Sequence, residues 1–122
     1  MDRIDLRVHV PRVPFERLRD DGREPSSTVR ERVCLARERM RRRIRAGARR
    51  LNADLTVADV KRFCQVAGDT ETLLAEAVRA RRLSARGYHR VLRVARTAAD
   101  LDGRDEISAA DVALALMLRA DP

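Results

Sequence analysis

The chain has 122 residues and a formal net charge of +8, with two cysteines and three aromatic residues. This length fits one small domain with a single hydrophobic core. With 38% charged and 44% hydrophobic residues, the composition excludes a disordered chain and an integral membrane protein. No apolar run approaches the ~20 residues of a spanning helix, and no signal-peptide pattern follows Met1. We therefore expect a soluble cytoplasmic protein without a membrane partner.

The positive charge is concentrated in one part of the sequence. Residues 26–50 hold ten Arg and two Glu, whereas acidic and basic residues balance in the segments 1–25, 51–83 and 84–122. Almost all of the basic residues are Arg, and only Lys61 is Lys. A GC-rich genome explains that bias more simply than selection for guanidinium chemistry. The location of the excess charge is therefore more informative than its composition.

A period of two predicts one β-strand at the start of the chain, because Ile4, Leu6, Val8 and Val10 alternate with polar residues. No second stretch has this pattern. A lone strand cannot bury its face or pair its backbone. We therefore expect residues 1–25 to be the end of a larger core, followed by a Pro-rich linker.

Five helices are predicted after the linker, which makes residues 26–122 a small all-α bundle. Caps are expected at Thr28 with Glu31, at Thr56 with Asp59, at Ser84, and at Ser108 with Asp111. The first helix should end at Gly47, the second at Val66 before a break at Gly68, and the third should run from about Thr70 to Arg82. The side chains predicted to face inward are Val29, Val33, Ala36, Met40 and Ile44, then Val57, Val60, Phe63 and Cys64, then Leu73, Leu74, Ala77 and Val78, then Tyr88, Val91, Leu92, Ala95 and Ala99, and last Val112, Ala115, Leu116 and Leu118.

The residues that metal or nucleophilic chemistry needs are scattered. Cys34, Cys64, His9 and His89 lie on four elements without C-x-x-C or H-x-x-x-H spacing, which disfavours a zinc site. Nothing near either cysteine indicates an activated thiolate, and ordinary reduced thiols are the favoured interpretation. Of the three functions that the sequence suggests, a metal-binding protein is therefore the least favoured. No G-x-x-x-x-G-K motif occurs, so this chain alone should neither bind ATP well nor hydrolyse it.

The first helix could bind nucleic acid through a broad cationic face. Its arginines away from the apolar stripe are Arg30, Arg37, Arg41, Arg42 and Arg45. A solvated helix, or one paired with acidic groups elsewhere, explains this face equally well. The helices from Thr56 to Arg82 also resemble a helix-turn-helix, but Asp69, Glu71 and Glu76 would face DNA phosphates with like charge, which favours simple packing. A stand-alone basic nucleic-acid-binding module is thus the alternative function.

The most specific local pattern is L-S-A-R-G-Y-H-R-V-L-R-V-A-R-T-A-A-D-L over residues 83–101. Arg86, Arg90 and Arg93 fall on one face of the predicted helix. Arg86 also lies in the first turn, where free N–H groups and the helix dipole favour an anion. From spacing alone, an exposed basic helix face remains the simpler explanation.

This pattern occurs with several others in one order: D-R-I-D-L at residues 2–6, V-P-R-V-P at 10–14, V-R-E-R-V at 29–33 with A-R at 36–37, N-A-D-L at 52–55 and F-C at 63–64. The combination resembles the C-terminal part of the magnesium-chelatase-like AAA+ ATPases of the ComM/YifB type, over almost the whole chain. The resemblance implies an AAA+ lid domain, preceded by one strand of the AAA+ core. It accounts for the orphan strand.

The resemblance also implies roles for three arginines. Arg3 looks like the arginine finger that meets the γ-phosphate held by a neighbouring subunit, and Arg86 looks like sensor 2, in cis or in trans. Arg90, on the same face, is a further candidate for nucleotide binding. The Arg cluster at residues 41–50 matches no functional motif.

For the intact parent, the resemblance implies ATP and Mg²⁺ as cofactors, with none in this chain by itself. The implied partners are the upstream AAA+ core, neighbouring subunits of a homo-oligomeric ring, and DNA. ComM-type members are linked to DNA branch migration during natural transformation, and related chelatase subunits to metal insertion into porphyrins. The parent would be an ATPase, whereas this chain would be a regulatory and assembly module.

Overall fold

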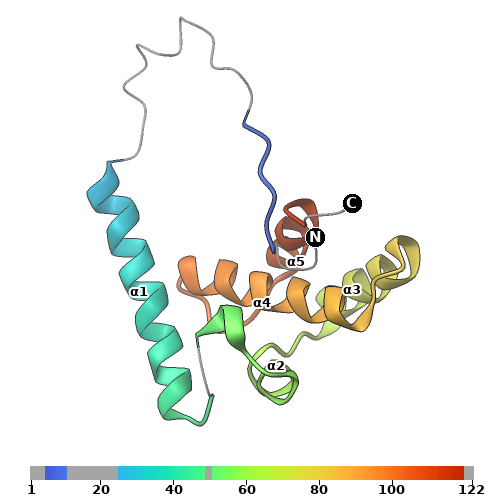
Figure 1. Cartoon of the computed structure of the whole chain (residues 1–122), viewed down its shortest axis with the longest axis horizontal. Coiled ribbons are helices and arrows are strands. Elements are labelled where there is room, and N and C mark those ends of the chain that lie inside the picture. The colour runs from blue at the N-terminus through green and yellow to red at the C-terminus, as the bar shows by residue number, and fades with distance from the viewer. Residues whose placement is uncertain (1–4, 11–24, 49–50, 120–122) are drawn as a thin grey trace, which may run out of the picture.

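The computed structural model describes residues 5–10, 25–48 and 51–119. These residues form a small helical domain (Figure 1), which confirms the predicted all-α class. The helices are α1 (Ser26–Arg45), the 3-10 turn η2 (Asn52–Asp54), α2 (Val57–Phe63), α3 (Gly68–Arg81), α4 (Ala85–Leu101) and α5 (Ala109–Met117). None of the helices in the described part of the chain combines the length and apolarity that a membrane crossing requires.

Helix α4 is the centre of the domain, because α1, η2, α2 and α5 all pack against it, and α3 packs against α5 (Figure 1). Two alanines on its inner face, Ala95 and Ala99, are fully buried. Their small side chains allow neighbouring helices to approach closely. The remaining core is apolar and comes from α2, α3, α4, α5 and the connections between helices; it comprises Ala48, Leu55, Val60, Cys64, Leu74, Ala77, Leu83, Val91, Leu92, Ile107, Val112, Ala115 and Leu116.

Three of the four predicted caps are confirmed. Thr56 with Asp59 and Ser108 with Asp111 form capping boxes, in which each side chain binds the other residue's backbone N–H. Ser84 Oγ accepts a hydrogen bond from Gly87 N at 3.1 Å. The predicted cap at Thr28 is wrong, because α1 already begins at Ser26, after Pro25 in an extended conformation. Proline fixes φ and has no N–H to satisfy, so it can precede a helix without a side-chain cap.

Only part of the predicted apolar stripe of α1 is buried. Ala36 and Met40 are buried, but Val29, Val33 and Ile44 are each about 40% exposed, so their predicted inward placement is wrong. The reason is the position of α1 at the edge of the domain, where it crosses the C-terminal end of α4 and its first turns extend past the other helices (Figure 1).

The boundaries around α2 also differ from the prediction. Helix α2 ends at Phe63 rather than Val66, and Val57 is 53% exposed because it lies in the first turn on the solvent side. Gly68 was predicted to lie in a break between two helices. It is instead the first residue of α3 and has a φ of +58°.

The predicted strand is reduced to a single bridge in the described residues. Leu6 forms an isolated antiparallel bridge with Arg119, and Arg7 N donates to Leu118 O at 2.7 Å. Val8 and Val10 are 65% and 79% exposed. The apolar residues alternate as expected of a strand, but no neighbouring strand among the described residues covers the apolar face of this segment. Ile4 lies outside the described residues.

Candidate functional site

The N-terminal end of α4 is positioned by the short connection from α3. Arg82 ends α3 with a left-handed φ of +49°, and the next residue, Leu83, is buried in the core. Ser84 then caps α4. This tight connection turns the chain within three residues, so that the first turn of α4 emerges at the surface.

Arg86 lies in this first turn, and its side chain is exposed. Here the first backbone N–H groups have no acceptor within the helix, and the helix dipole adds partial positive charge. An exposed guanidinium at such a position can bind a phosphate with two parallel hydrogen bonds. The arrangement is therefore suited to an anion presented from outside the domain.

Arg90 lies one turn further along α4 and forms an ion pair within the domain. Its Nε is 3.2 Å from Asp5 Oδ1, and its side chain is only 20% exposed. The pair joins α4 to the segment that also contacts the end of α5 through Leu6 and Arg7. Arg3, the predicted arginine finger, lies outside the described residues. The structure thus places Asp5, two residues after Arg3, beside the helix that carries Arg86.

Arg93 and His89 lie further along α4 and are half-buried. The Nε of Arg93 and the Nδ1 of His89 are buried and have no hydrogen-bond partner in the described part of the chain. Partial burial lowers the pKa of His89, and the nearby charges of Arg93 and Lys61 lower it further. His89 is therefore neutral near pH 7. Arg93 does not share the exposed environment of Arg86, although the helical period places both on one side.

Arg93 borders a small apolar pocket of about 250 Å³ between α4, α5 and the segment at Leu6. The walls of this pocket are almost entirely hydrocarbon, from Val94, Leu101, Leu114 and neighbouring residues. The polar residues of its lining are Arg93, Thr97 and Asp5, and the Asp5 carboxylate is paired with Arg90.

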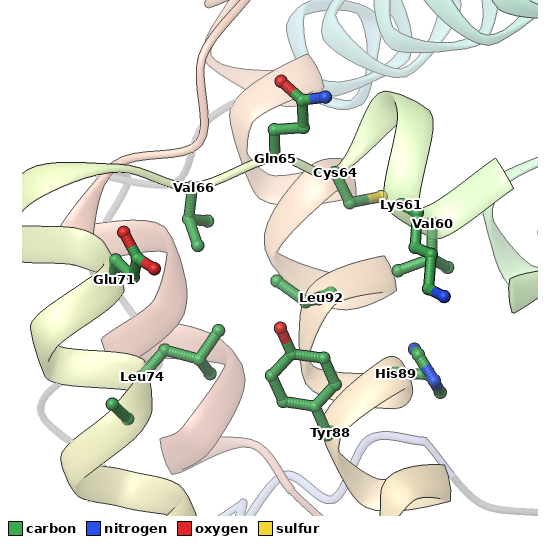
Figure 2. A pocket seen from close by; sticks show the side chains of 11 residues that line it. Val60, Lys61, Cys64, Gln65, Val66, Glu71, Leu74, Tyr88, His89 and Leu92 are labelled. Atoms are coloured by element: carbon green, nitrogen blue, oxygen red, sulfur yellow. The ribbon is translucent and has the colours of Figure 1, made fainter. Parts of the chain in front are cut away.

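A larger pocket of about 470 Å³ lies between α2, α3 and α4 (Figure 2). The hydroxyl of Tyr88 points into it, between Leu74 on α3 and Val60 on α2, while Lys61 and His89 lie on one side of its rim. Cys64 also lines it, and burial raises the pKa of this thiol to about 11. The thiol is therefore protonated at neutral pH and is not a nucleophile.

No group of three His, Cys, Asp or Glu side chains that could hold a metal ion occurs among the residues described. The two cysteines are separate and free: Cys34 is exposed on α1, and Cys64 is buried. The described side chains thus offer neither a metal centre nor a paired thiol.

The strongest electrostatic cluster is centred on Asp100, which is 1% exposed. Its Oδ2 accepts hydrogen bonds from Arg43 on α1 and from the Asn52 side chain, the latter at 2.8 Å. Its Oδ1 lies 3.4 Å from Arg96 Nε, four residues earlier on α4. The cluster therefore joins α1, η2 and α4 through one carboxylate.

Arg96 extends the cluster to two further segments. Its guanidinium donates to the backbone oxygens of Phe63, Arg104 and Asp105, at 3.3, 3.0 and 2.8 Å. Burial lowers the pKa of Arg96, and the Asp100 charge partly offsets this. This cluster was not among the features predicted from the sequence. An aspartate at position 100, directly after the buried Ala99 and four residues after an arginine, was the available signal.

The cluster gives a structural role to several segments noted in the sequence. Asn52 belongs to N-A-D-L, Phe63 to F-C, and Arg43 to the arginine run that matched no functional motif. Arg39, one turn before Arg43, donates to Asp105 Oδ1 and to Gly103 O, both at 2.6 Å. Arg39 and Arg43 thus hold α1 on the domain.

Comparison with known proteins agrees with this architecture. Residues 23–119 match the family model described as "Magnesium chelatase, subunit ChlI C-terminal". The chain is 38% identical over 122 residues to Competence protein ComM of Haemophilus influenzae, and 34% identical over 122 residues to the uncharacterised protein YifB of Salmonella typhimurium. An uncharacterised protein of Mycobacterium tuberculosis is 37% identical over 119 residues.

These alignments cover 98% of this chain but only 23% of ComM and YifB and 24% of the mycobacterial protein. The chain thus spans about a quarter of the length of these relatives. Since the family model covers most of the helical domain, the chain belongs to the family of magnesium chelatase subunit ChlI C-terminal domains, in the form that occurs in ComM and YifB.

Proposed function

We propose that this domain is the nucleotide-sensing lid of a ComM/YifB-type AAA+ ATPase. In this proposal Arg86 is the sensor 2 arginine, and Arg3 is the arginine finger that reaches the nucleotide of a neighbouring subunit. The domain itself does not hydrolyse ATP. It couples the state of bound nucleotide to the position of the helices around α4.

The observation that carries the proposal is the position of Arg86. Its exposed side chain lies in the first turn of a capped helix, whose axis runs through the centre of the domain. A guanidinium there can neutralise charge on a phosphoryl group as that charge develops during transfer. The central packing of α4 would then transmit a movement of this end to the whole domain.

The ion pair between Asp5 and Arg90 supports the same proposal. It holds the segment that follows Arg3 against α4, one helical turn from Arg86. Arg90 would therefore act as a positioning residue for this segment, in addition to its candidate role at the nucleotide.

The residues present fit only one part of a nucleotide site. Arg86 and the N-terminus of α4 suit phosphate oxygens, and ATP when bound would supply the γ-phosphoryl group that is transferred. No described cluster of carboxylates suits Mg²⁺. The sequence has no Gly-rich phosphate loop with a lysine. In this proposal, Mg²⁺ and most contacts to ATP belong to an AAA+ core.

For the whole protein we propose ATP-driven remodelling of DNA by a cytoplasmic homo-oligomeric ring. The similarity to a relative named a competence protein supports a role in competence, and we propose DNA branch migration during natural transformation as the task. The task of the ring is a separate part of the proposal from the role of Arg86.

The test of the sensor role is steady-state ATP hydrolysis by the full-length protein that carries this domain. We expect Arg86→Ala to lower kcat by about 10²-fold, because one preorganised charged donor is lost from the transition state. Arg86→Lys should remain close to the alanine variant, since an ammonium cannot reproduce the two parallel hydrogen bonds.

The matched control is Arg79→Ala, which removes an exposed arginine from the last turn of α3, a different helix from the one that carries Arg86. It should hydrolyse ATP within two-fold of the wild type. Size-exclusion chromatography must show that both variants still assemble. Unchanged turnover in an assembled Arg86→Ala protein would remove the sensor assignment.

A further inference from the structure

Helix α1 presents a stripe of arginines on the side that faces away from the domain. At about 100° per residue, Arg30, Arg37, Arg41 and Arg45 fall within about 80° of one another. All four are exposed, and the middle of their arc lies about 115° around the helix from Ala36 and Met40, the buried residues of α1. We call these four arginines the outward stripe.

The outward stripe differs from the arginines that attach α1 to the domain. Arg39 and Arg43 lie towards α4 and are used in pairs with Asp105 and Asp100. By contrast, no ion pair neutralises Arg30 or Arg37 within the described part of the chain. Arg41 and Arg45 share a single carboxylate, Glu38, at 3.5 and 3.1 Å.

Folding does not explain the outward stripe. Arg37, Arg41 and Arg45 are spaced four residues apart on one helix, where like charges destabilise the helix by a few tenths of a kcal/mol per pair. The rest of the chain cannot offset the charge, because residues 51–122 contain equal numbers of acidic and basic side chains. A charge that the fold does not need, and that slightly destabilises it, indicates an external anionic partner.

The shape and composition of the stripe identify the partner. It is linear and extends about 22 Å from Arg30 to Arg45, at 1.5 Å per residue. The positions that lie among its arginines, Cys34 and Glu38, offer no large apolar or aromatic side chain. A protein interface normally has an apolar centre, whereas phosphates are bound by guanidinium groups alone.

We propose that the outward stripe of α1 binds the sugar-phosphate backbone of a nucleic acid duplex without reading its sequence. The contacts are guanidinium–phosphate pairs from Arg30, Arg37, Arg41 and Arg45. Helix α1 has no aromatic side chain on which unstacked bases could be held, so single-strand stacking contributes nothing.

This inference deepens the proposed DNA-remodelling task and rests on it for its biological meaning. The binding itself is argued from α1 alone, and α1 does not contain Arg86. Loss of ATP hydrolysis in Arg86→Ala and loss of duplex binding in α1 variants are therefore independent results.

The test is binding of the 122-residue chain to a 20-base-pair DNA duplex of mixed sequence, measured by fluorescence anisotropy over a range of KCl concentrations. Each phosphate contact contributes about −0.9 to the slope of log K against log salt. Four contacts predict a slope of about −3.6. A slope near zero, or no binding at 50 mM KCl, would overturn the proposal.

The double variant Arg37→Ala/Arg41→Ala should reduce the magnitude of this slope by about two and weaken binding at 50 mM KCl by more than ten-fold. The control is Lys61→Ala/Arg79→Ala, which removes the same net charge from exposed positions on α2 and α3. It should bind within about two-fold of the wild type. Equal losses in both variants would mean that net charge, rather than the outward stripe, governs binding, and the proposal would fail.

A gain-of-binding variant tests the geometry. Glu38→Gln removes the carboxylate that pairs with Arg41 and Arg45, and should tighten duplex binding by about three-fold or more. Glu76→Gln makes the same charge change on α3 and should tighten it less than Glu38→Gln does. Equal effects of the two would count against the stripe.

Cys34 provides an independent readout because it is exposed among the arginines of the stripe. Bound duplex should slow its labelling by uncharged N-ethylmaleimide by at least five-fold, while the already slow Cys64 does not change. Polyglutamate tests the competing partner class: if it binds more tightly than DNA at equal charge concentration, the surface fits an acidic protein and the proposal is wrong.

Discussion

Arg43 of α1 and Asp100 of α4 form a buried ion pair that links the edge helix of this domain to its central helix. Asp100 is also within reach of Arg96 and Asn52, so one carboxylate holds two guanidinium groups and an amide. A carboxylate with this many partners can be tolerated in the interior, although the charges lose their hydration there.

Removal of that carboxylate should therefore be severe. Asp100→Asn leaves two arginines without their counter-charge, and we expect the free energy of unfolding to fall by about 3–5 kcal/mol. Urea denaturation followed by circular dichroism measures the effect.

The control for Asp100→Asn is Asp102→Asn, which removes an exposed partner of Arg104. It should destabilise by less than about 1 kcal/mol. If Asp100→Asn does not fold, Arg43→Met, which preserves most of the side-chain volume, should give a measurable partial loss. Similar effects of the two aspartate variants would show that the Asp100 cluster contributes little.

Helix capping gives a second prediction. Ser108→Ala should destabilise the domain by about 1 kcal/mol, because the Ser108 hydroxyl no longer accepts from Asp111 N. Thr28→Ala should change stability by less than about 0.5 kcal/mol, since Thr28 lies inside α1 and caps nothing. Paired thermal melts of the two variants distinguish a real cap from a capping pattern that the chain does not use.

The two cysteines should react at very different rates. Cys34 is exposed, whereas Cys64 is 2% exposed and its pKa is raised from 9.0 to about 11 by burial. A pKa that is higher by two units lowers the thiolate fraction at pH 8 by about 10²-fold. Burial of the sulfur slows the reaction further. Mass spectrometry after maleimide treatment should show one fast label in the folded chain and two in urea.

The variant Cys34→Ser should lack the fast label. Rapid labelling of the remaining Cys64 in that variant, under native conditions, would mean that the α2 region opens readily.

We expect protonation of Asp111 to lower the stability of the domain in acid. Burial raises the pKa of Asp111, but hydrogen bonds from Arg104 and Ser108 outweigh this and leave the pKa below its ordinary value of 3.8. Since the folded-state pKa is depressed, the stabilisation is present above about pH 4 and is lost as the pH falls through the folded-state pKa.

Urea midpoints measured between pH 6 and pH 2 test this expectation. Asp111→Asn should be less stable than the wild type at pH 6, and the difference should shrink towards pH 2. Asp54→Asn, an exposed change in η2, should leave the pH dependence unaltered. A constant difference between Asp111→Asn and the wild type across the range would contradict the assignment.

The sequence predicted the helices and most of the core well because local signals carried them. The period of apolar residues in α4 and the capping boxes at Thr56 and Ser108 depend only on residues within a few positions of each other. Family resemblance from short motifs was likewise confirmed by the match over residues 23–119.

Tertiary context decided what the sequence did not predict. Val33 and Ile44 follow the same helical period as Met40, but only the crossing point with α4 determines which of them is covered. The Arg43–Asp100 pair joins positions 57 residues apart, which no periodicity reveals. The role of Arg86 stays a prediction, because it depends on a nucleotide supplied from outside this domain.

Arg86 and Asp100 lie near the two ends of helix α4. They are 14 residues apart, which is about 21 Å along the axis at 1.5 Å per residue. A tilt of about 10° about the Arg86 end would displace Asp100, and with it the attachment of α1, by roughly 3.5 Å. Such a tilt would move the residues around Arg86 very little. At the Asp100 end, it would shift α1 by more than half of the rise of one helical turn.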